Sequence, residues 1–240
     1  MRSLRFALLL CCALHAPGAF AFNAVIGDTA VVVPEPPGYL DARNVSAQLQ
    51  QYGQSLAPQS NRVLGFLVQK EDQQRIAANL GPQLKRYHLV QVNRSMEAPT
   101  ITLKQFEELR EAIRAQAASG LESARADVDK ELAQRSKQMA KSSGDPSRSV
   151  KLGQTTTLGL YEDRATAIGF LTNVSFPRVV NGKEEVLPVV VATSVTLVKG
   201  KALFLYTYFI RTSDADVAAA RQSARVWLAA VEKANQPPKK

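Results

Sequence analysis

The sequence predicts an α+β protein whose mainly antiparallel sheet is flanked by helices, and three patterns support that fold class. Within residues 195–209, two apolar runs rich in β-branched and aromatic residues flank Lys199-Gly200, a pattern typical of a β-hairpin. A stripe of apolar residues at helical spacing predicts one long helix over about residues 102–141. A second stripe predicts a C-terminal helix over about residues 214–234, which we expect to pack on the sheet.

The first half of the chain alternates short strands and helices. Strands are expected at residues 30–33, 62–69 and 86–94, and short helices at residues 44–56 and 71–80. Proline ends the first strand and the first helix, and Gly81-Pro82 ends the second helix.

The long helix begins at a capping box formed by Thr102 and Gln105. Its apolar stripe has a mean spacing of about 3.7 residues, which favours a straight helix over a left-handed coiled coil. The opposite face mixes basic and acidic residues, with pairs four apart such as Glu131 and Arg135. We expect that face to be solvated, and a partner helix or a membrane surface is the alternative. The stripe consists of Phe106, Leu109, Ile113, Ala117, Leu121, Ala124, Val128, Leu132, Ser136 and Met139.

The second half of the chain is rich in strand patterns. Strands are expected at residues 152–161, 165–176 and 186–198, followed by a last strand that ends at Arg211. We expect a turn at residues 162–164 and a hairpin turn at Asn181-Gly182.

The last strand and the helix after it carry the strongest packing signals. Both faces of the strand are largely apolar, which predicts a central strand covered on both sides. Ser213 is expected to cap the C-terminal helix, with Asp214 and Asp216 at its positive end. We expect Trp227 to anchor this helix to the sheet.

Residues 1–21 have the features of a cleaved signal peptide. Arg2 and Arg5 precede an apolar run, and Ala19-Phe20-Ala21 fits the small-x-small pattern of a cleavage site. The apolar run is shorter than the roughly 18–20 residues that a membrane span needs. We therefore expect cleavage after Ala21, a periplasmic or secreted protein, and no transmembrane span in the mature chain.

The expected domain organisation follows from these boundaries. Residues 22–236 form a single α+β domain and residues 237–240 form a tail. Within the domain, an N-terminal half (22–141) and a β-rich C-terminal half (150–236) are joined by residues 142–149, which have linker composition. We expect both halves to share one sheet, with two separate lobes as the alternative.

The chain is basic, and the charge limits the classes of partner. The net charge is +9, and removal of residues 1–21 takes away two arginines and no acid, which leaves +7. The basic residues are spread along the chain without a dense block. An exported protein rarely meets nucleic acid, so we expect no nucleic-acid partner and at most a weak contact with an anionic membrane surface.

The residues needed for common catalytic sites are scarce. Cys11, Cys12 and His15 lie in the signal peptide, so the mature chain lacks a disulfide, a thiolate nucleophile and a Cys/His zinc site. His88 is then the remaining histidine, and its strand position predicts a core or edge residue more than a catalytic one. The acids Glu162 and Asp163 are expected in a turn. We therefore assign no catalytic, cofactor-binding or metal-binding residue, and expect no cofactor.

The two ends of the mature chain resemble the PsbP/DcrB-like α/β/α sandwich proteins. Val33-Pro34 leading to Gly38-Tyr39 is similar to the opening Pro-x-Gly-aromatic pattern of that family, and residues 195–231 are similar to its closing hairpin and helix. The resemblance implies an antiparallel sheet with helices on both faces. It also implies a protein that binds, assembles or chaperones other proteins, and it carries over no functional residue.

Three functional hypotheses follow. The first is an exported, non-catalytic envelope protein that binds a protein partner. The second is an immunity or inhibitor protein that neutralises a toxin or lytic enzyme. The third, from a different class, is a hydrolase that uses His88 or a pair of acids.

Overall fold

The computed structural model describes residues 20–118, 153–180 and 183–237. The strands are β1 Ala21–Ile26, β2 Thr29–Pro34, β3 Tyr39–Asp41, β4 Asn61–Gln69, β5 Arg86–Asn93, β6 Thr155–Arg164, β7 Ala167–Val180, β8 Lys183–Val198 and β9 Lys201–Ile210. The helices are η1 Ala42–Asn44, α1 Ala47–Ser55, α2 Lys70–Ala77, η2 Arg94–Met96, α3 Leu103–Ala118 and α5 Asp214–Ala234.

Seven strands form one antiparallel sheet in the order β3-β4-β5-β9-β8-β7-β6. Strand β9, from the end of the chain, lies between β5 and β8 and joins the two halves. Both halves therefore share one sheet, as expected. The strands β1 and β2 form a separate hairpin.

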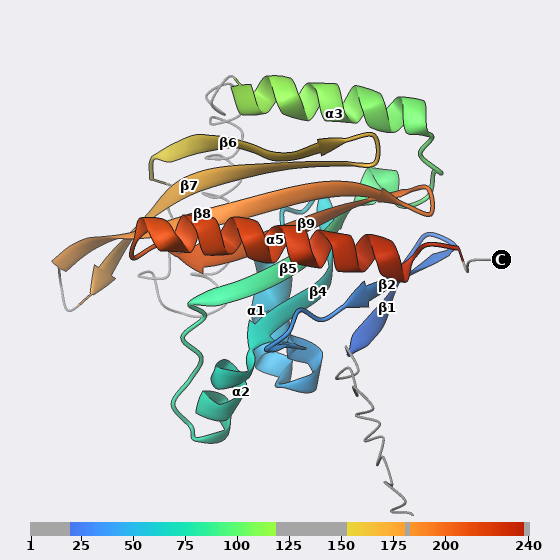
Figure 1. Ribbon diagram of the computed structural model, residues 1–240. Coiled ribbons are helices and arrows are strands. Elements are labelled where there is room, and N and C mark those ends of the chain that lie inside the picture. The colour runs from blue at the N-terminus through green and yellow to red at the C-terminus, as the bar shows by residue number, and fades with distance from the viewer. Residues whose placement is uncertain (1–19, 119–152, 181–182, 238–240) are drawn as a thin grey trace, which may run out of the picture.

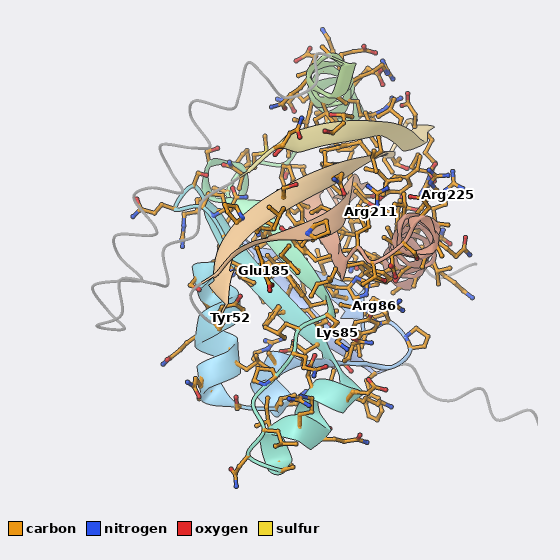
Figure 2. The ribbon with its side chains drawn as sticks, turned by 90° about the vertical axis from the view of Figure 1, so that its left-hand side faces the viewer. Tyr52, Lys85, Arg86, Glu185, Arg211 and Arg225 are labelled. Carbon is orange, nitrogen blue, oxygen red and sulfur yellow. The ribbon has the colours of Figure 1, made fainter. Side chains whose placement is uncertain are left out.

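Helices cover both faces of the sheet. Figure 1 shows α5 lying along one face beside the β1–β2 hairpin, and Figure 2 shows α1 on the opposite side of the sheet. On the α5 face, Trp227, Leu228 and Val231 pack against residues of β2, β5 and β9. On the other face, Leu49 of α1 packs over β4 and β5, and Phe106 of α3 packs over β7 and β8. The layers are therefore helix, sheet and helix.

The central position of β9 was predicted from its two apolar faces, and the structure confirms it. Leu203 and Leu205 face α5, whereas Ala202 and Phe204 lie on the other face with Phe106. The turn before β9 needs two residues with positive φ, and Lys199 and Gly200 have φ values of 50° and 76°. These values suit a tight two-residue hairpin turn.

The C-terminal helix begins and ends as the sequence predicts. The side chains and backbone of Ser213 and Asp216 form a capping box at its start. The residue after its end, Asn235, is buried, and its side-chain amide bonds both backbone groups of Val32 at 2.9 and 2.7 Å. The helix is therefore fastened to β2 beyond its last turn.

Three expectations change within the described ranges. The strand β1 and the short edge strand β3 were not predicted. The turn between β6 and β7 consists of Ala165 and Thr166 rather than residues 162–164, because Arg164 pairs with Ala167.

Other expected features fall on residues that the structure does not describe. The long helix is observed over Leu103–Ala118, and its expected continuation to residue 141 lies outside the described residues. The same holds for the linker at residues 142–149 and for the hairpin turn at Asn181-Gly182.

Candidate functional site

His88 lies inside the protein between the sheet and α5. The side chain is fully buried, and its Nδ1 lies 2.9 Å from the hydroxyl of Thr207 on β9. The ring of Tyr39 meets it edge-on at 4.4 Å, and the indole of Trp227 lies at 4.7 Å. Burial lowers the pKa of His88 to about 3, so the imidazole is neutral at physiological pH.

This environment matches the expectation of a core histidine. Nε2 of His88 has no hydrogen-bond partner within the described part of the chain. A general base has to reach a proton of the substrate within hydrogen-bond distance. The full burial of His88 keeps the imidazole away from any substrate in solution.

The acids Glu162 and Asp163 lie at the end of β6, and arginines hold both of them. Asp163 accepts hydrogen bonds from Arg110 at 2.6 Å and Arg114 at 2.8 Å. The hydrogen bond from Arg110 lowers the pKa of Asp163, and Arg114 adds to the effect. Glu162 bonds Arg164 at 3.1 Å. The arginines keep the carboxylate of Asp163 ionised, whereas a general acid needs a carboxyl that holds its proton near neutral pH.

A buried lysine that was not predicted from the sequence stabilises this same end of the sheet, next to the β8–β9 turn. Lys201 is fully buried, and its Nζ donates to the carbonyls of Glu97, Ala98 and Pro99 at 2.9, 3.2 and 3.2 Å. The carboxylate of Asp28, in the β1–β2 turn, lies 3.6 Å from Nζ. The ammonium thereby donates its hydrogen bonds to the backbone and connects β9 to the loop before α3.

The end of the sheet at which α5 begins presents a different set of side chains to solvent. We define the end surface by five residues from four parts of the chain, and Figure 2 looks onto this end of the molecule with each of them labelled. They are Tyr52 on α1, Lys85 and Arg86 at the start of β5, Glu185 on β8 and Arg211 after β9.

Contacts within the protein hold two arginines of the end surface in place, and both side chains remain partly exposed. Arg86 bonds Asp216 at 3.2 Å and lies over the ring of Phe209, with 43% of its side chain exposed. Arg211 bonds Asp214 at 2.7 Å, with 31% of its side chain exposed. Because these contacts are made within the protein, less side-chain entropy is lost when the same groups meet a partner.

An aromatic ladder leads from the sheet to the end surface. The rings of Tyr87 and Tyr208, on neighbouring strands, stack at 4.6 Å. Phe66 lies edge-on to Tyr87 at 5.5 Å, and Tyr52 of α1 lies 6.2 Å from Phe66. Tyr52 is 43% exposed, so the ladder ends in an accessible ring.

The described part of the chain offers no site for a metal ion and no membrane span. Within residues 20–118, 153–180 and 183–237, no group of three or more His, Cys, Asp or Glu side chains is arranged to hold a metal. In the same ranges, no helix is both long and apolar enough to cross a membrane.

Comparisons with known proteins show a distant structural likeness. No protein-family model matches the sequence, and no curated protein matches it at a significant level. The structure is similar to the 1.9 Å crystal structure of the Saccharomyces cerevisiae Ran-binding protein Mog1p, with a TM-score of 0.38 and 10% identity over 90% of this chain and 94% of that chain. The structure of a point mutant of protein Mog1 gives the same values. Likeness at this level transfers no function.

Proposed function

We propose that the protein is an exported, non-catalytic envelope protein that binds a protein partner through the end surface. The observation that carries the proposal is the presence, at one end of the sheet, of an exposed aromatic residue, Tyr52, and of two fixed and partly exposed arginines, Arg86 and Arg211. Tyrosine and arginine are the residue types that most often contribute binding energy at protein interfaces.

The state of the other titratable groups supports a binding role. His88 is neutral and buried, and the ammonium of Lys201 is bound to backbone carbonyls. The acids at the end of β6 are paired with arginines. In each case the side chain is engaged in contacts within the protein. These groups therefore favour a binding protein over an enzyme.

The charge of the end surface indicates the partner. Lys85 is exposed, and Arg86 and Arg211 bond the acids in the first turn of α5. An acidic residue, Glu185, lies at the same end of the sheet on β8. Such a mixed surface suits a protein with both acidic and polar groups better than a uniformly anionic lipid surface. We expect contact with an anionic membrane to be weak and to be screened by salt.

The test is affinity capture of the tagged mature protein from its own envelope fraction, with cross-linking and mass spectrometry. The variant Tyr52→Ala/Lys85→Glu changes one exposed ring and one exposed lysine of the end surface. The matched control is Leu103→Ala/Lys104→Glu, which changes an exposed apolar residue and an exposed lysine at the start of α3.

We expect one stoichiometric partner with the unchanged protein and with the control, and at least a tenfold weaker recovery with the end-surface variant. A partner that is a toxin or a lytic enzyme would make the protein its neutraliser. Capture of nothing above an untagged sample, or equal loss with both variants, would contradict binding through this surface.

A further inference from the structure

The bond between Ala21 and Phe22 lies inside a strand. In the β1–β2 hairpin, Ala21 is opposite Pro34 and Phe22 is opposite Val33. One residue earlier, the carbonyl of Phe20 accepts a hydrogen bond of 2.7 Å from the amide of Glu35. The expected signal-peptide cleavage site is therefore also the start of a folded element.

The ladder pattern shows which hydrogen bonds a cut at this bond would remove. Directly opposite residues of an antiparallel pair alternate between hydrogen-bonded and non-bonded positions. Phe20 and Glu35 form a bonded pair, so Ala21 and Pro34 are a non-bonded pair and Phe22 and Val33 are the next bonded pair. A proline suits the non-bonded position because it has no amide to donate.

A cut after Ala21 would thus remove the bond between Phe20 and Glu35 and keep the pair Phe22–Val33. Hydrolysis breaks the amide C–N bond: the hydroxyl of water goes to the Ala21 carbonyl carbon and the proton goes to the Phe22 nitrogen. The new amino group is an ammonium at neutral pH. It still donates to the carbonyl of Val33, because an ammonium has three protons to donate.

The side chain of Phe22 occupies a socket formed by Gly65 of β4 and Arg43 of η1. A Cβ placed on Gly65 would lie 2.3 Å from the tip of the Phe22 ring, so the ring needs a glycine at this position of β4. The guanidinium of Arg43 lies over the face of the same ring, 4.6 Å from its centroid. Asp41 holds that guanidinium at 2.6 Å.

The hairpin is also fastened along its outer edge. Trp227 donates to the carbonyl of Pro34, and Asn235 bonds both backbone groups of Val32. Once α5 has packed, the backbone around residues 21 and 22 is paired on β2 and β2 is tied to α5. A peptidase that needs an extended, unpaired substrate has no access to the bond in this state.

We propose that the chain is processed at the Ala21–Phe22 bond before the β1–β2 hairpin closes, and that Phe22 then docks between Arg43 and Gly65 as the N-terminal residue. The inference rests on the proposed export of the protein. It adds an order of events, in which cleavage precedes closure, and a structural role for the new N-terminus.

The test uses the full-length precursor in detergent and a purified signal peptidase. One sample is folded, and the other is diluted from urea directly into the reaction. We expect the unfolded precursor to yield a product that begins at Phe22, and the folded precursor to be cut at least tenfold more slowly. The N-terminal residue is read by mass spectrometry of the intact product.

Two variants away from the scissile bond test the socket. Gly65→Ala closes the socket and Arg43→Gln removes the cation from the ring, so each should speed the cleavage of the folded precursor. If Gly65→Ala does not fold, Arg43→Gln still tests whether the socket slows cleavage. Leu80→Ala, at an exposed position, is the control and should leave the rate unchanged.

The outcomes separate this inference from the proposed function. Equal rates for folded and unfolded precursor would overturn the order of events and leave export standing. A product that begins at another residue would overturn the docking of Phe22. An unfolded precursor that is not cut would overturn the export as well, whatever the capture experiment finds.

Discussion

The indole nitrogen of Trp227 donates a 2.9 Å hydrogen bond to the backbone carbonyl of Pro34, which lies 193 residues earlier in the chain. The contact is buried, and it joins the C-terminal helix to the last residue of β2. Trp227 also packs against the ring of His88, 4.7 Å away. One side chain therefore connects the hairpin, the sheet and the helix.

Trp227→Phe should destabilise the protein although it keeps an aromatic ring in place. The carbonyl of Pro34 would be left buried without its donor, which costs about 1–3 kcal/mol. Urea unfolding followed by circular dichroism measures the change. Val226→Ala, at the exposed neighbouring position, is the control and should shift the free energy of unfolding by less than about 0.5 kcal/mol. An unchanged midpoint for Trp227→Phe would mean that the hydrogen bond adds nothing to stability.

The buried histidine should make stability depend on pH. The pKa of His88 is about 3 in the folded protein and about 6.5 when exposed in the unfolded chain. Between these values the unfolded chain binds a proton that the folded protein does not, so the free energy of unfolding falls as the pH falls. The slope from this group approaches about 1.4 kcal/mol per pH unit below pH 6.

Urea unfolding at pH 7.5, 6.5, 5.5 and 5.0 measures this slope while the carboxylates remain ionised. In His88→Phe the group that titrates is gone, so the curve over this range should be flatter than that of the unchanged protein. Parallel curves for the two proteins would show that His88 is not the source of the dependence.

The fold class could be predicted because its signals are local. The alternation in β9 and the turn residues Lys199-Gly200 mark a hairpin from a short stretch of sequence. The bounds of α5 follow from a capping residue and an apolar stripe in the same way. Local patterns of this kind need no knowledge of the partner elements.

The features that were missed depend on distant parts of the chain. A lysine beside a turn is usually exposed, and Lys201 is buried because three carbonyls of residues 97–99 surround its ammonium. Strand β1 follows a signal-like segment and exists through its pairing with β2. The end surface is likewise invisible in the sequence, since the order of strands in the sheet brings together residues from α1, β5, β8 and the end of β9.

The carboxylate of Asp216 should contribute to stability above about pH 4 and lose that contribution in acid. It accepts hydrogen bonds from the backbone amides of Thr212 and Ser213 at 2.9 and 3.0 Å. The bonds from Thr212 lower the pKa of Asp216 to about 2, with smaller contributions in the same direction from Ser213 and Arg86. A carboxyl with a lowered pKa stabilises the fold when ionised, and the contribution disappears as the pH falls through the folded pKa.

Asp216→Asn should therefore destabilise the protein at pH 7 by about 1–2 kcal/mol, the usual range for loss of a helix-capping interaction. The difference from the unchanged protein should shrink as the pH approaches 2. Asp214→Asn is the control, because Asp214 is 93% exposed and an exposed ion pair contributes at most about 1 kcal/mol. Equal effects of the two substitutions at pH 7 would contradict the role assigned to Asp216.

Lys201 provides the last prediction, because its buried ammonium binds three backbone carbonyls at once. Lys201→Met keeps an unbranched side chain, one atom shorter, and removes the charge and the donors. The carbonyls of Glu97, Ala98 and Pro99 would then be left without the ammonium, and we expect a loss of about 3–5 kcal/mol. Lys199→Met, two residues earlier in the same hairpin, removes one exposed bond to the carbonyl of Ala30 and should cost less than about 1 kcal/mol. Thermal unfolding of the two variants at pH 7 compares them directly. If both midpoints shift equally, burial of the ammonium among the carbonyls is not what stabilises this end of the sheet.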